Sequence, residues 1–511
     1  MEKEGILENS LKNEIWGNSY IRNNGISNEE GTYKNDVNAY YESGYADDKH
    51  ISNEDIRKKL YDTFLMPTKK DSKEYIGIEI EIPIVNLNKE AVDFSIVHQV
   101  TESFLNEFDT FQIDGKDYEG NIYALKDSLT GDMLCYDCSY NNIEFAMGKE
   151  EDLFTINKRF KKYYAFVKGE FEKYNHTLTG MGINPYRKYN NEIPIPNERY
   201  LMLFNHLKSF PKYSDKMMYF HNYPAYGMFS SASQVQLDVP YDELLDTINI
   251  FSKLEPIKAL LFSNSVLLEE NEDYLCFRDI LWEHSTHGVN PHNIGMYDIE
   301  FEGMEELLSY LESLDIYCVE RNGIYINFPS MNLKDYFNSE KIIGEYYCKG
   351  EYKTTEFKPS IDDINYLRAF KFINLTFRGT LEYRSICTQP IGNSMSVAAF
   401  HVGLKHKLNE LKSLFFNSPV YHNSYNSNEL RKFLIKREIP DSINKKDLEE
   451  LTRNVLDLAY DGLKERNLGE EIFLISLYEN LENKTNPGKH LLDSLENGKS
   501  LEELIREYGD L

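Results

Sequence analysis

Tyr75-Ile-Gly-Ile-Glu-Ile-Glu-Ile-Pro-Ile-Val85 is the stretch that decides the fold of this chain. Its isoleucines alternate with Glu79 and Glu81, which is the two-residue period of a β-strand with one apolar face. The two carboxylates then lie about 6–7 Å apart on the other face. Like charges this close are unfavourable unless a positive charge lies between them. The stretch therefore predicts either an edge strand with a solvated acidic face or a strand that binds cations.

Three further segments alternate in the same way and carry polar groups on one face. These polar groups are Glu144 between Ile143 and Phe145; Gln234, Gln236 and Asp238; and Thr376, Arg378, Thr380, Glu382 and Arg384 on a strand at 376–386. Asp137 precedes Glu144, and the intervening Asn141-Asn142 leaves its direction open. One such strand is ordinary surface, whereas four in one chain indicate a site.

Helical periodicity accompanies these strands. Apolar residues recur at helical spacing at about 94–108 and 151–175, a capping signal opens a helix at 52–67, and further helical stretches lie at 241–262 and beyond residue 395. We therefore predict an α+β fold, in which a mainly antiparallel sheet has helices on its apolar face and a wet, charged concavity on the other.

Composition narrows the class of protein. Of 511 residues, 41% are hydrophobic and 14% aromatic, which is enough for a large core. The net charge of −28 argues against nucleic acid and anionic membranes as partners. We see no run of 18 apolar residues and no signal peptide, and six cysteines are too few for a disulfide scaffold, so we expect a cytoplasmic protein.

The cysteines and the N-terminal residues add two expectations. Cys135 and Cys138 form one Cys-x-x-Cys pair without a second pair, so structural zinc is not expected; we interpret them as reduced thiols, with a redox switch as the alternative. Residues 1–50 show no sustained period and are interpreted as an irregular extension. Residues 51–511 are expected to form a single domain with a helical C-terminal part from about 395.

The acidic residues point to divalent cations. Bare anions at Glu79, Glu81, Asp137, Glu144 and Glu382 could not share one concavity. Oxygen ligands without a Cys/His set suit Mg²⁺ or Mn²⁺, and nucleotide phosphates often complete such coordination. Arg378 and Arg384 would then face phosphate oxygens. No Walker loop is present, because position 493, ahead of Asn497-Gly-Lys-Ser500, is Asp where that loop needs Gly.

These residues carry a resemblance to the glutamate–cysteine ligase family, nearest to its plant and proteobacterial branch. The motifs occur in the family's order over roughly residues 70–500. They are Gly77-Ile-Glu-Ile-Glu81, the block from Asp137 to Glu144, Ser233-Gln-Val-Gln-Leu-Asp238, Leu261-Phe-Ser-Asn-Ser265, Tyr274-Leu-Cys-Phe-Arg-Asp-Ile-Leu-Trp282, Leu381-Glu-Tyr-Arg-Ser385, Val455–Leu463 and Asn486–Asp493.

The resemblance implies a glutamine-synthetase-like fold, whose curved sheet forms a funnel lined by metal ligands. It implies ATP-dependent ligation of the γ-carboxylate of glutamate to the amine of cysteine through a γ-glutamyl phosphate, the first step of glutathione biosynthesis. The partners would be glutamate, cysteine and ATP, with no nucleic acid or membrane, in a monomer or homodimer. Residues 51–511 would be the catalytic domain.

Site residues follow from the same resemblance. The metal ligands would be Glu79, Glu81, Asp137, Glu144, Gln234 and Glu382. Glu382 and Arg384 would be catalytic, Arg378 and Arg384 would bind ATP phosphates, and Arg278 and Trp282 would bind the substrate. Plainer interpretations remain for three of the polar residues: an ion pair of Glu382 with Arg384, a local salt bridge of Arg278 with Asp279, and a solvated position for Gln236.

The segment 283–292 departs from the family pattern. It carries His284, His287 and His292 where related sequences have an Asp/Thr-rich stretch. A loop of hydrogen-bonding histidines is the interpretation, and a transition-metal site is the alternative. The departure favours a rival function, a ligase of the same mechanism with another amine acceptor or acid donor. A rival of another class is a non-catalytic metal- or nucleotide-binding protein.

Overall fold

A nine-stranded antiparallel sheet is built around β1 (Ile76–Asn86) in the computed structural model, which describes residues 51–213, 215, 219–268, 273–422 and 425–511. The predicted extension 1–50 lies outside the described residues. The sheet order is β14 (Ile373–Leu375), β15 (Thr380–Tyr383), β7 (Ser233–Asp238), β1, β5 (Asn142–Glu150), β4 (Met133–Tyr136), β3 (Ile122–Asp127) and β2 (Phe111–Lys116), with β6 (His176–Leu178) also paired to β1. The four predicted polar segments therefore become neighbours.

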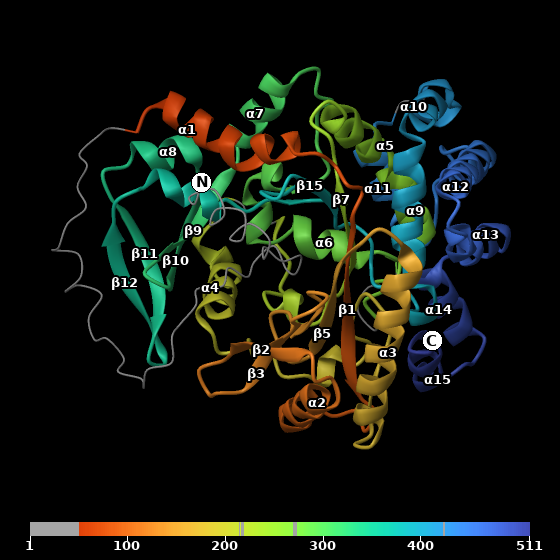
Figure 1. Ribbon diagram of the computed structural model, residues 1–511, viewed down its shortest axis with the longest axis horizontal. Helices are drawn as coiled ribbons and strands as arrows, with labels where there is room; N and C mark the ends of the chain where they lie inside the picture. Colours follow the sequence, from red (N-terminus) through yellow and green to blue (C-terminus); the bar gives the residue numbers. More distant parts are fainter. Residues whose placement is uncertain (1–50, 214, 216–218, 269–272, 423–424) are drawn as a thin grey trace, which may run out of the picture.

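Helices cover the apolar face of this sheet. They are α2 (Phe94–Glu107), α3 (Leu153–Glu172), α5 (Leu244–Phe262) and α9 (Met395–His406), and each contacts at least one strand (Figure 1). The side chains of Ile80, Ile82 and Leu381 are fully buried beneath them. Aromatic pairs such as Phe145 with Phe160 join the two layers, with ring centroids 5.5 Å apart. The predicted α+β class, with helices on one face of a mainly antiparallel sheet, is confirmed.

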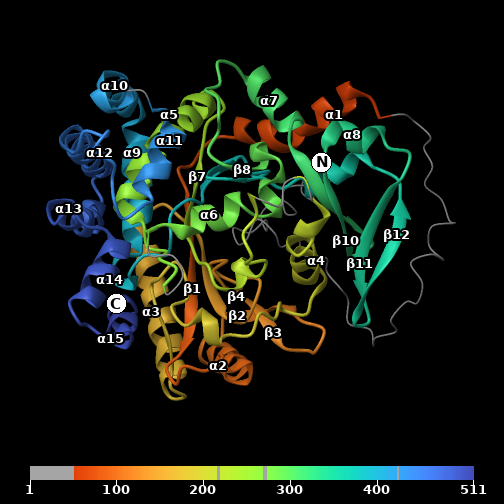
Figure 2. The same ribbon diagram turned by 180° about the vertical axis from the view of Figure 1, so that it is seen from behind.

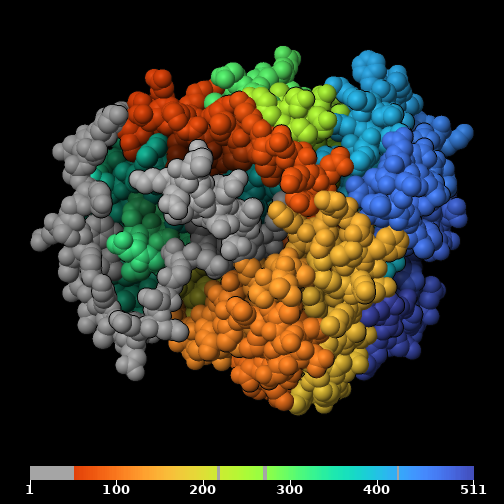
Figure 3. Space-filling model, viewed as in Figure 1, coloured from red at the N-terminus to blue at the C-terminus, as the bar shows by residue number. Residues whose placement is uncertain are grey.

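A second sheet lies on the other side of the molecule (Figure 2). Its antiparallel order is β12 (Glu351–Phe357), β11 (Ile342–Cys348), β10 (Ile324–Asn332) and β9 (Asp315–Arg321), and α4 (Glu198–Leu207) packs on β10. A short parallel pair, β8 (Ile294–Gly295) with β13 (Phe370–Lys371), carries residues of the site. The sequence patterns did not predict these strands. In Figure 3 the second sheet (green) lies below α1 (Asn53–Leu60, red).

The remaining helices frame these layers. They are α6 (Phe277–Glu283), α7 (Met304–Glu312) and α8 (Leu333–Asn338), then α10 (Leu408–Asn417), α11 (Ser427–Leu434), α12 (Lys445–Arg466), α13 (Ile475–Glu482), α14 (Pro487–Glu496) and α15 (Leu501–Tyr508). After α1 the chain continues as a π-helical turn (Tyr61–Leu65) and a 3₁₀ turn (Met66–Lys69). Within the described ranges, no helix combines the length and apolarity that a membrane span requires.

Two expectations about the polar face were wrong. The concavity is not wet at two of its carboxylates, since Glu382 is 0% and Glu79 only 5% exposed, whereas Glu81 and Asp137 are partly exposed. The strand predicted at 376–386 covers only Thr380–Tyr383. Gly379 turns the chain with φ +73°, and a Cβ there would lie 2.3 Å from the Pro67 carbonyl oxygen. Arg378 therefore lies in the β14–β15 turn rather than on the strand.

Candidate active site

The predicted polar residues converge on one face of the central sheet. The register places Glu81 opposite Glu144, Glu79 opposite Gln234, and Glu382 opposite Gln236. Directly opposed residues of antiparallel strands share a face, with Cβ atoms about 4.5–5.5 Å apart. The acidic and amide side chains of β1, β5, β7 and β15 thus form one continuous polar row.

Gln236 is the centre of this row. Its Nε2 donates to Glu79 Oε1 and to Glu382 Oε1, both at 3.0 Å, and its Oε1 accepts from Arg378 Nη2 at 2.8 Å. Glu382 also accepts from Arg384 Nη1, so the predicted ion pair is present. Gln236 is 4% exposed, and the expectation of a solvated position was wrong. A buried amide holds two carboxylates and an arginine in one network.

Glu81 occupies a second network one step along β1. It accepts from the Ala232 backbone N–H at 2.7 Å and from Gln234 Nε2 at 2.8 Å. The other amide atom, Gln234 Oε1, is buried and has no hydrogen-bond partner among the described residues. Buried oxygens without a partner are uncommon in native proteins. Gln234 therefore keeps one oxygen for a ligand.

Burial makes this face electrostatically unusual. It raises the pKa of Glu79 to about 8, with a further contribution from Glu382 and opposition from Arg384 and Arg378. It likewise raises the pKa of Glu81 to about 7, with Asp137 adding to the effect and Arg278 opposing it. Raised pKa values mean that burial favours the protonated, neutral form of these two carboxyl groups. A divalent cation bound beside them would favour the charged form instead.

A cavity of about 860 Å³, including its open mouth, lies against this face. Six predicted site residues line it: Glu81, Asp137, Gln234, Arg278, Trp282 and Arg384. The opposite wall comes from α4 and the second sheet, with Tyr317 and Cys318 of β9 and Tyr325 of β10. The predicted substrate residues therefore border one enclosed space.

Arg278 is held by backbone carbonyl groups. Its Nη1 donates to the Ser385 oxygen at 3.4 Å and its Nη2 to the Arg384 oxygen at 3.3 Å. The proposed local salt bridge with Asp279 is not formed. Asp279 instead receives two hydrogen bonds from Arg431, at 2.7 and 3.1 Å. Asp279 thus holds α6 to Arg431, while the Arg278 side chain lines the cavity.

The three histidines of segment 283–292 do not converge. His284 is exposed, His287 lines the cavity, and the Nδ1 of His292 lies 2.7 Å from Ser313 Oγ. In the part of the chain that the structure describes, no group of three or more His, Cys, Asp or Glu side chains is arranged to hold a metal ion. The predicted oxygen ligands lie in the separate Glu79–Glu382 and Glu81–Gln234 networks, with Glu144 opposite Glu81.

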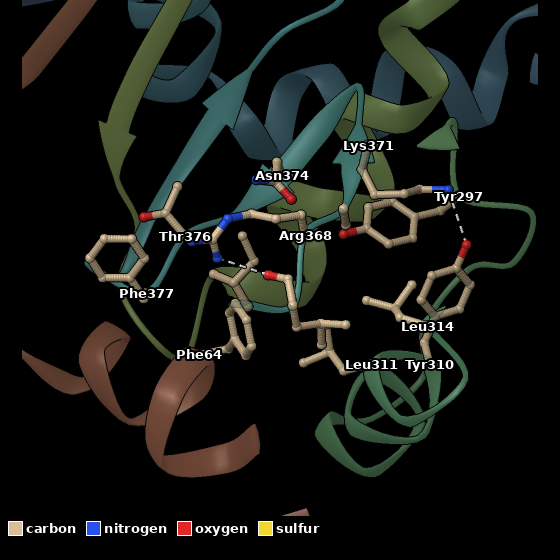
Figure 4. A pocket seen from close by; sticks show the side chains of 13 residues that line it. Phe64, Tyr297, Tyr310, Leu311, Leu314, Arg368, Lys371, Asn374, Thr376 and Phe377 are labelled. Atoms are coloured by element: carbon tan, nitrogen blue, oxygen red, sulfur yellow. Dashed lines mark hydrogen bonds between the residues drawn. The ribbon is translucent and has the colours of Figure 1, made fainter. Parts of the chain in front are cut away.

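A second cavity of about 620 Å³, including its mouth, opens beside the edge strand β14 (Figure 4). Aromatic residues Phe64, Tyr297, Tyr310 and Phe377 line it, together with Lys371, Asn374 and Thr376. Lys371 Nζ donates to the carbonyl oxygens of Ile294 and Met296 and to the Tyr310 hydroxyl, so its donors are used. Arg368 lines both cavities. Asn374 lies opposite Glu382 and on its face.

Sequence reasoning missed several residues of this site. Gln236 was placed on the correct face but not in its bridging role, because that role needs partners on two other strands. Arg199, Arg368 and the walls from the second sheet carried no recognisable local signal, since each adds a single side chain from a distant segment. His287 was noticed only as part of a histidine-containing loop.

Comparison with known proteins finds similarity to ligases. No protein-family model matches it. It is 24% identical to the chloroplastic glutamate–cysteine ligase of Solanum lycopersicum over 357 residues, which are 67% of this chain and 62% of that protein. The enzyme of Brassica juncea gives 24% identity over 354 residues, 67% of this chain and 63% of that protein. The chain thus matches about three fifths of the length of these relatives.

Solved structures show weaker likeness. Glutamate–cysteine ligase from Francisella tularensis in complex with AMP superposes with a TM-score of 0.46 at 12% identity, covering 86% of this chain and 89% of that one. A bifunctional glutathione synthetase from Pasteurella multocida gives a TM-score of 0.43 at 12% identity, covering 90% of this chain and 53% of that one.

Proposed function

The chain is a relative of the glutamate–cysteine ligases, as its motifs predicted, and from this relationship we propose that it is an ATP-dependent carboxylate–amine ligase. It joins the γ-carboxylate of glutamate to the amine of cysteine and releases ADP and phosphate, the first step of glutathione biosynthesis. The observation that carries this proposal is the buried row in which Gln236 bridges Glu79 and Glu382 beside Arg378 and Arg384. Residues 51–511 act as one catalytic domain.

The donor set fits Mg²⁺ or Mn²⁺. Every candidate ligand supplies oxygen, and Gln234 keeps a buried oxygen without a partner among the described residues. The residues that would hold the metal are Glu79, Glu81, Asp137, Glu144, Gln234 and Glu382. When bound, the ion supplies positive charge that neutralises the triphosphate of ATP.

The arginines serve the phosphoryl transfer. Arg384 lines the main cavity beside Glu382 and stabilises negative charge on the transferring phosphoryl group, while Arg378 binds phosphate from the β14–β15 turn. Arg278 holds a carboxylate of the acid substrate. An oxygen of the γ-carboxylate forms a bond to the γ-phosphorus, and the bond from that phosphorus to ADP breaks. The amine then attacks the acyl carbon, and phosphate leaves with the electron pair while the nitrogen loses a proton to solvent.

The second cavity suits the nucleoside of ATP. Its aromatic lining offers faces for stacking a base, and Asn374 offers an amide for hydrogen bonding. Asn374 shares a face with Glu382, so a nucleoside bound there would direct its phosphates along the carboxylate row. Arg368, which lines both cavities, lies where nucleotide and acid would meet.

ADP release with MgATP and glutamate tests the proposal, with cysteine, 2-aminobutyrate, glycine, alanine and water as acceptors. Strong stimulation by cysteine, with 2-aminobutyrate close behind, is expected. Turnover with none of these acceptors would favour the ligase with a different acceptor or acid, which the altered segment around His287 supports as a second candidate. Absence of ATP turnover under every condition would contradict the enzyme assignment and favour a binding protein.

A further inference from the structure

His287 occupies the wall of the main cavity next to the residues that would bind the acid substrate. It belongs to a 3₁₀ turn (Thr286–Val289) that directly follows α6, and Arg278, Trp282 and His287 of this segment all line the cavity. The turn is tightly constrained, because a Cβ on Gly288 would lie 2.0 Å from the Glu283 carbonyl oxygen. The backbone next to His287 is therefore closely packed against the end of α6.

Aromatic rings hold the His287 imidazole on several sides. Ring centroids lie 4.1 Å away for Phe370, 5.7 Å for Trp282, 5.4 Å for Tyr317 and 5.2 Å for His206. These rings come from β13, α6, β9 and α4, so four elements meet at this residue. Only 5% of His287 is exposed. Packing of this kind orients the ring without using its nitrogens.

The nitrogens of this cluster are not satisfied within the protein. His287 Nδ1, Trp282 Nε1 and both ring nitrogens of His206 are buried and have no hydrogen-bond partner among the described residues. Native proteins pair most buried polar atoms, and exceptions indicate a bound water or ligand. Two of these three residues line the cavity. The three side chains thus form a buried cluster at the cavity whose hydrogen-bonding capacity no described residue uses.

The charge of this wall differs from the charge at the acid-binding end. That end carries the ionisable side chains of Arg278, Arg384, Glu81 and Asp137, whereas burial lowers the pKa of His287 well below its usual value, so the ring is neutral near pH 7. An amine attacks an activated carboxylate only in its uncharged form. A neutral nitrogen can accept an N–H hydrogen bond from that form without repelling it.

We propose that His287 binds and orients the amine acceptor. The inference rests on the proposed ligase function and adds to it the residue that selects the second substrate. His287 acts as a positioning residue, and no proton transfer is assigned to it.

Hydroxylamine, used as the nucleophile, distinguishes positioning of the amino-acid acceptor from activation of the acid. This small nucleophile traps an activated carboxylate as a hydroxamate and has no side chain or carboxylate to be recognised. In H287F the rings still pack but both nitrogens are lost. We expect kcat/KM for the amino-acid acceptor to fall about tenfold or more, mainly through KM, because a hydrogen bond is lost. ADP release at saturating hydroxylamine should stay within about twofold of wild type.

Two further variants complete the experiment. H287Q restores a hydrogen-bonding group and should recover part of the loss, and H284F changes an exposed histidine of the same segment and should affect neither reaction. If H287F folds poorly, H287Q alone still compares the two nucleophiles.

Each outcome has one meaning. Selective loss of amino-acid turnover supports the inference. Equal loss with both nucleophiles, or no loss with either, overturns it while leaving the ligase proposal intact. Absence of ADP release by wild type with every nucleophile contradicts the ligase proposal, and the inference falls with it.

Discussion

The buried polar row depends on single side chains, above all on Gln236. The amide of Gln236 donates to Glu79 and Glu382 and accepts from Arg378, which lets two carboxylates lie in a buried row. A carboxylate at this position could not donate, and a lysine could not accept. Changes to single residues here should therefore separate metal binding, phosphoryl transfer and stability.

Replacing Glu382 by Gln should weaken metal binding, because it removes the charge of a proposed ligand while the side chain keeps its size and shape. We expect turnover to fall at least about 100-fold, because even residues that only orient metal ligands cost roughly 10–100-fold. The stabilisation of the wild type by Mg²⁺, about 2.7 kcal/mol at a concentration near 100 times Kd, should also shrink. Thermal unfolding with and without Mg²⁺ measures this. E410Q, at an exposed position, is the control. Unchanged activity in E382Q would refute the metal assignment.

Arg384→Lys tests the phosphoryl-transfer role. A lysine keeps the charge but loses the planar fork, so kcat should fall by roughly 10²–10³ while the Michaelis constant for ATP changes little. Steady-state kinetics with varied ATP distinguishes the two parameters. A rise in that Michaelis constant alone would show that Arg384 acts in ground-state binding.

Lys371 should make stability depend on pH. Burial lowers its pKa from 10.5 to about 7. Between these values the unfolded chain binds more protons than the folded protein, so the free energy of unfolding contributed by Lys371 rises with pH, by up to about 1.4 kcal/mol per unit. Urea unfolding of wild type and K371M at pH 7, 8 and 9 measures it. The free energy of unfolding of wild type minus that of K371M should increase as pH rises. A difference that did not change with pH would contradict this expectation.

At the scale of elements, α6 illustrates how a short helix becomes a rigid platform. The helix is only seven residues long, and its Asp279 is gripped by Arg431 of α11. Arg431 also donates to the backbone oxygen and to the carboxylate of Glu255 in α5, whose other oxygen pairs with Lys258. Arg431 is 3% and Glu255 0% exposed. This network joins three helices behind the residue that would bind the acid substrate.

Arg431→Met should therefore damage both stability and substrate binding. Removing one partner leaves Glu255 and Asp279 short of positive charge, which costs about 3–5 kcal/mol for a buried pair. The Michaelis constant for glutamate should rise, because α6 loses its anchor and Arg278 its position. K412M breaks an exposed pair with Asp246 and should cost at most about 1 kcal/mol. Denaturant unfolding measures the loss of stability, and steady-state kinetics with varied glutamate measures the Michaelis constant. An unchanged Michaelis constant would show that Arg431 stabilises the helices without positioning Arg278.

At the scale of the whole molecule, the site exists because the two sheets enclose it. The first sheet supplies carboxylates and arginines, and the second sheet with α4 supplies the opposite wall. The second cavity lies where β14 meets α7 and the π-helical turn after α1. Nucleotide and acid would thus approach the carboxylate row from two sides, with Arg368 lining both spaces.

Phe377→Ala should weaken nucleotide binding if the second cavity holds the base. Phe377 lies at its rim with the Arg378 guanidinium over its ring, and loss of base stacking costs about 1–3 kcal/mol. Calorimetric titration with MgADP measures the change. F416A, which removes an exposed phenylalanine from α10, provides the matched control. Equal affinity in wild type and F377A would place the base elsewhere.

The sequence by itself determined which residues share a face. Strand parity is a local property of the backbone, so the alternation around Glu79, Glu81, Gln234, Gln236 and Glu382 predicted a polar row opposite an apolar one. Helical periodicity also predicted the helices that cover the apolar face. The order of the motifs along the chain was enough to indicate the relationship to the ligases.

The tertiary structure decided burial, partners and enclosure. Gln236 is 157 positions from Glu79 and 146 from Glu382, and Arg431 is 152 from Asp279, so no local pattern could pair them. The second sheet turned the predicted wet concavity into an enclosed cavity with buried carboxylates. Local period fixes the direction of a side chain, whereas dielectric environment and hydrogen-bond partners depend on which distant segments pack against it.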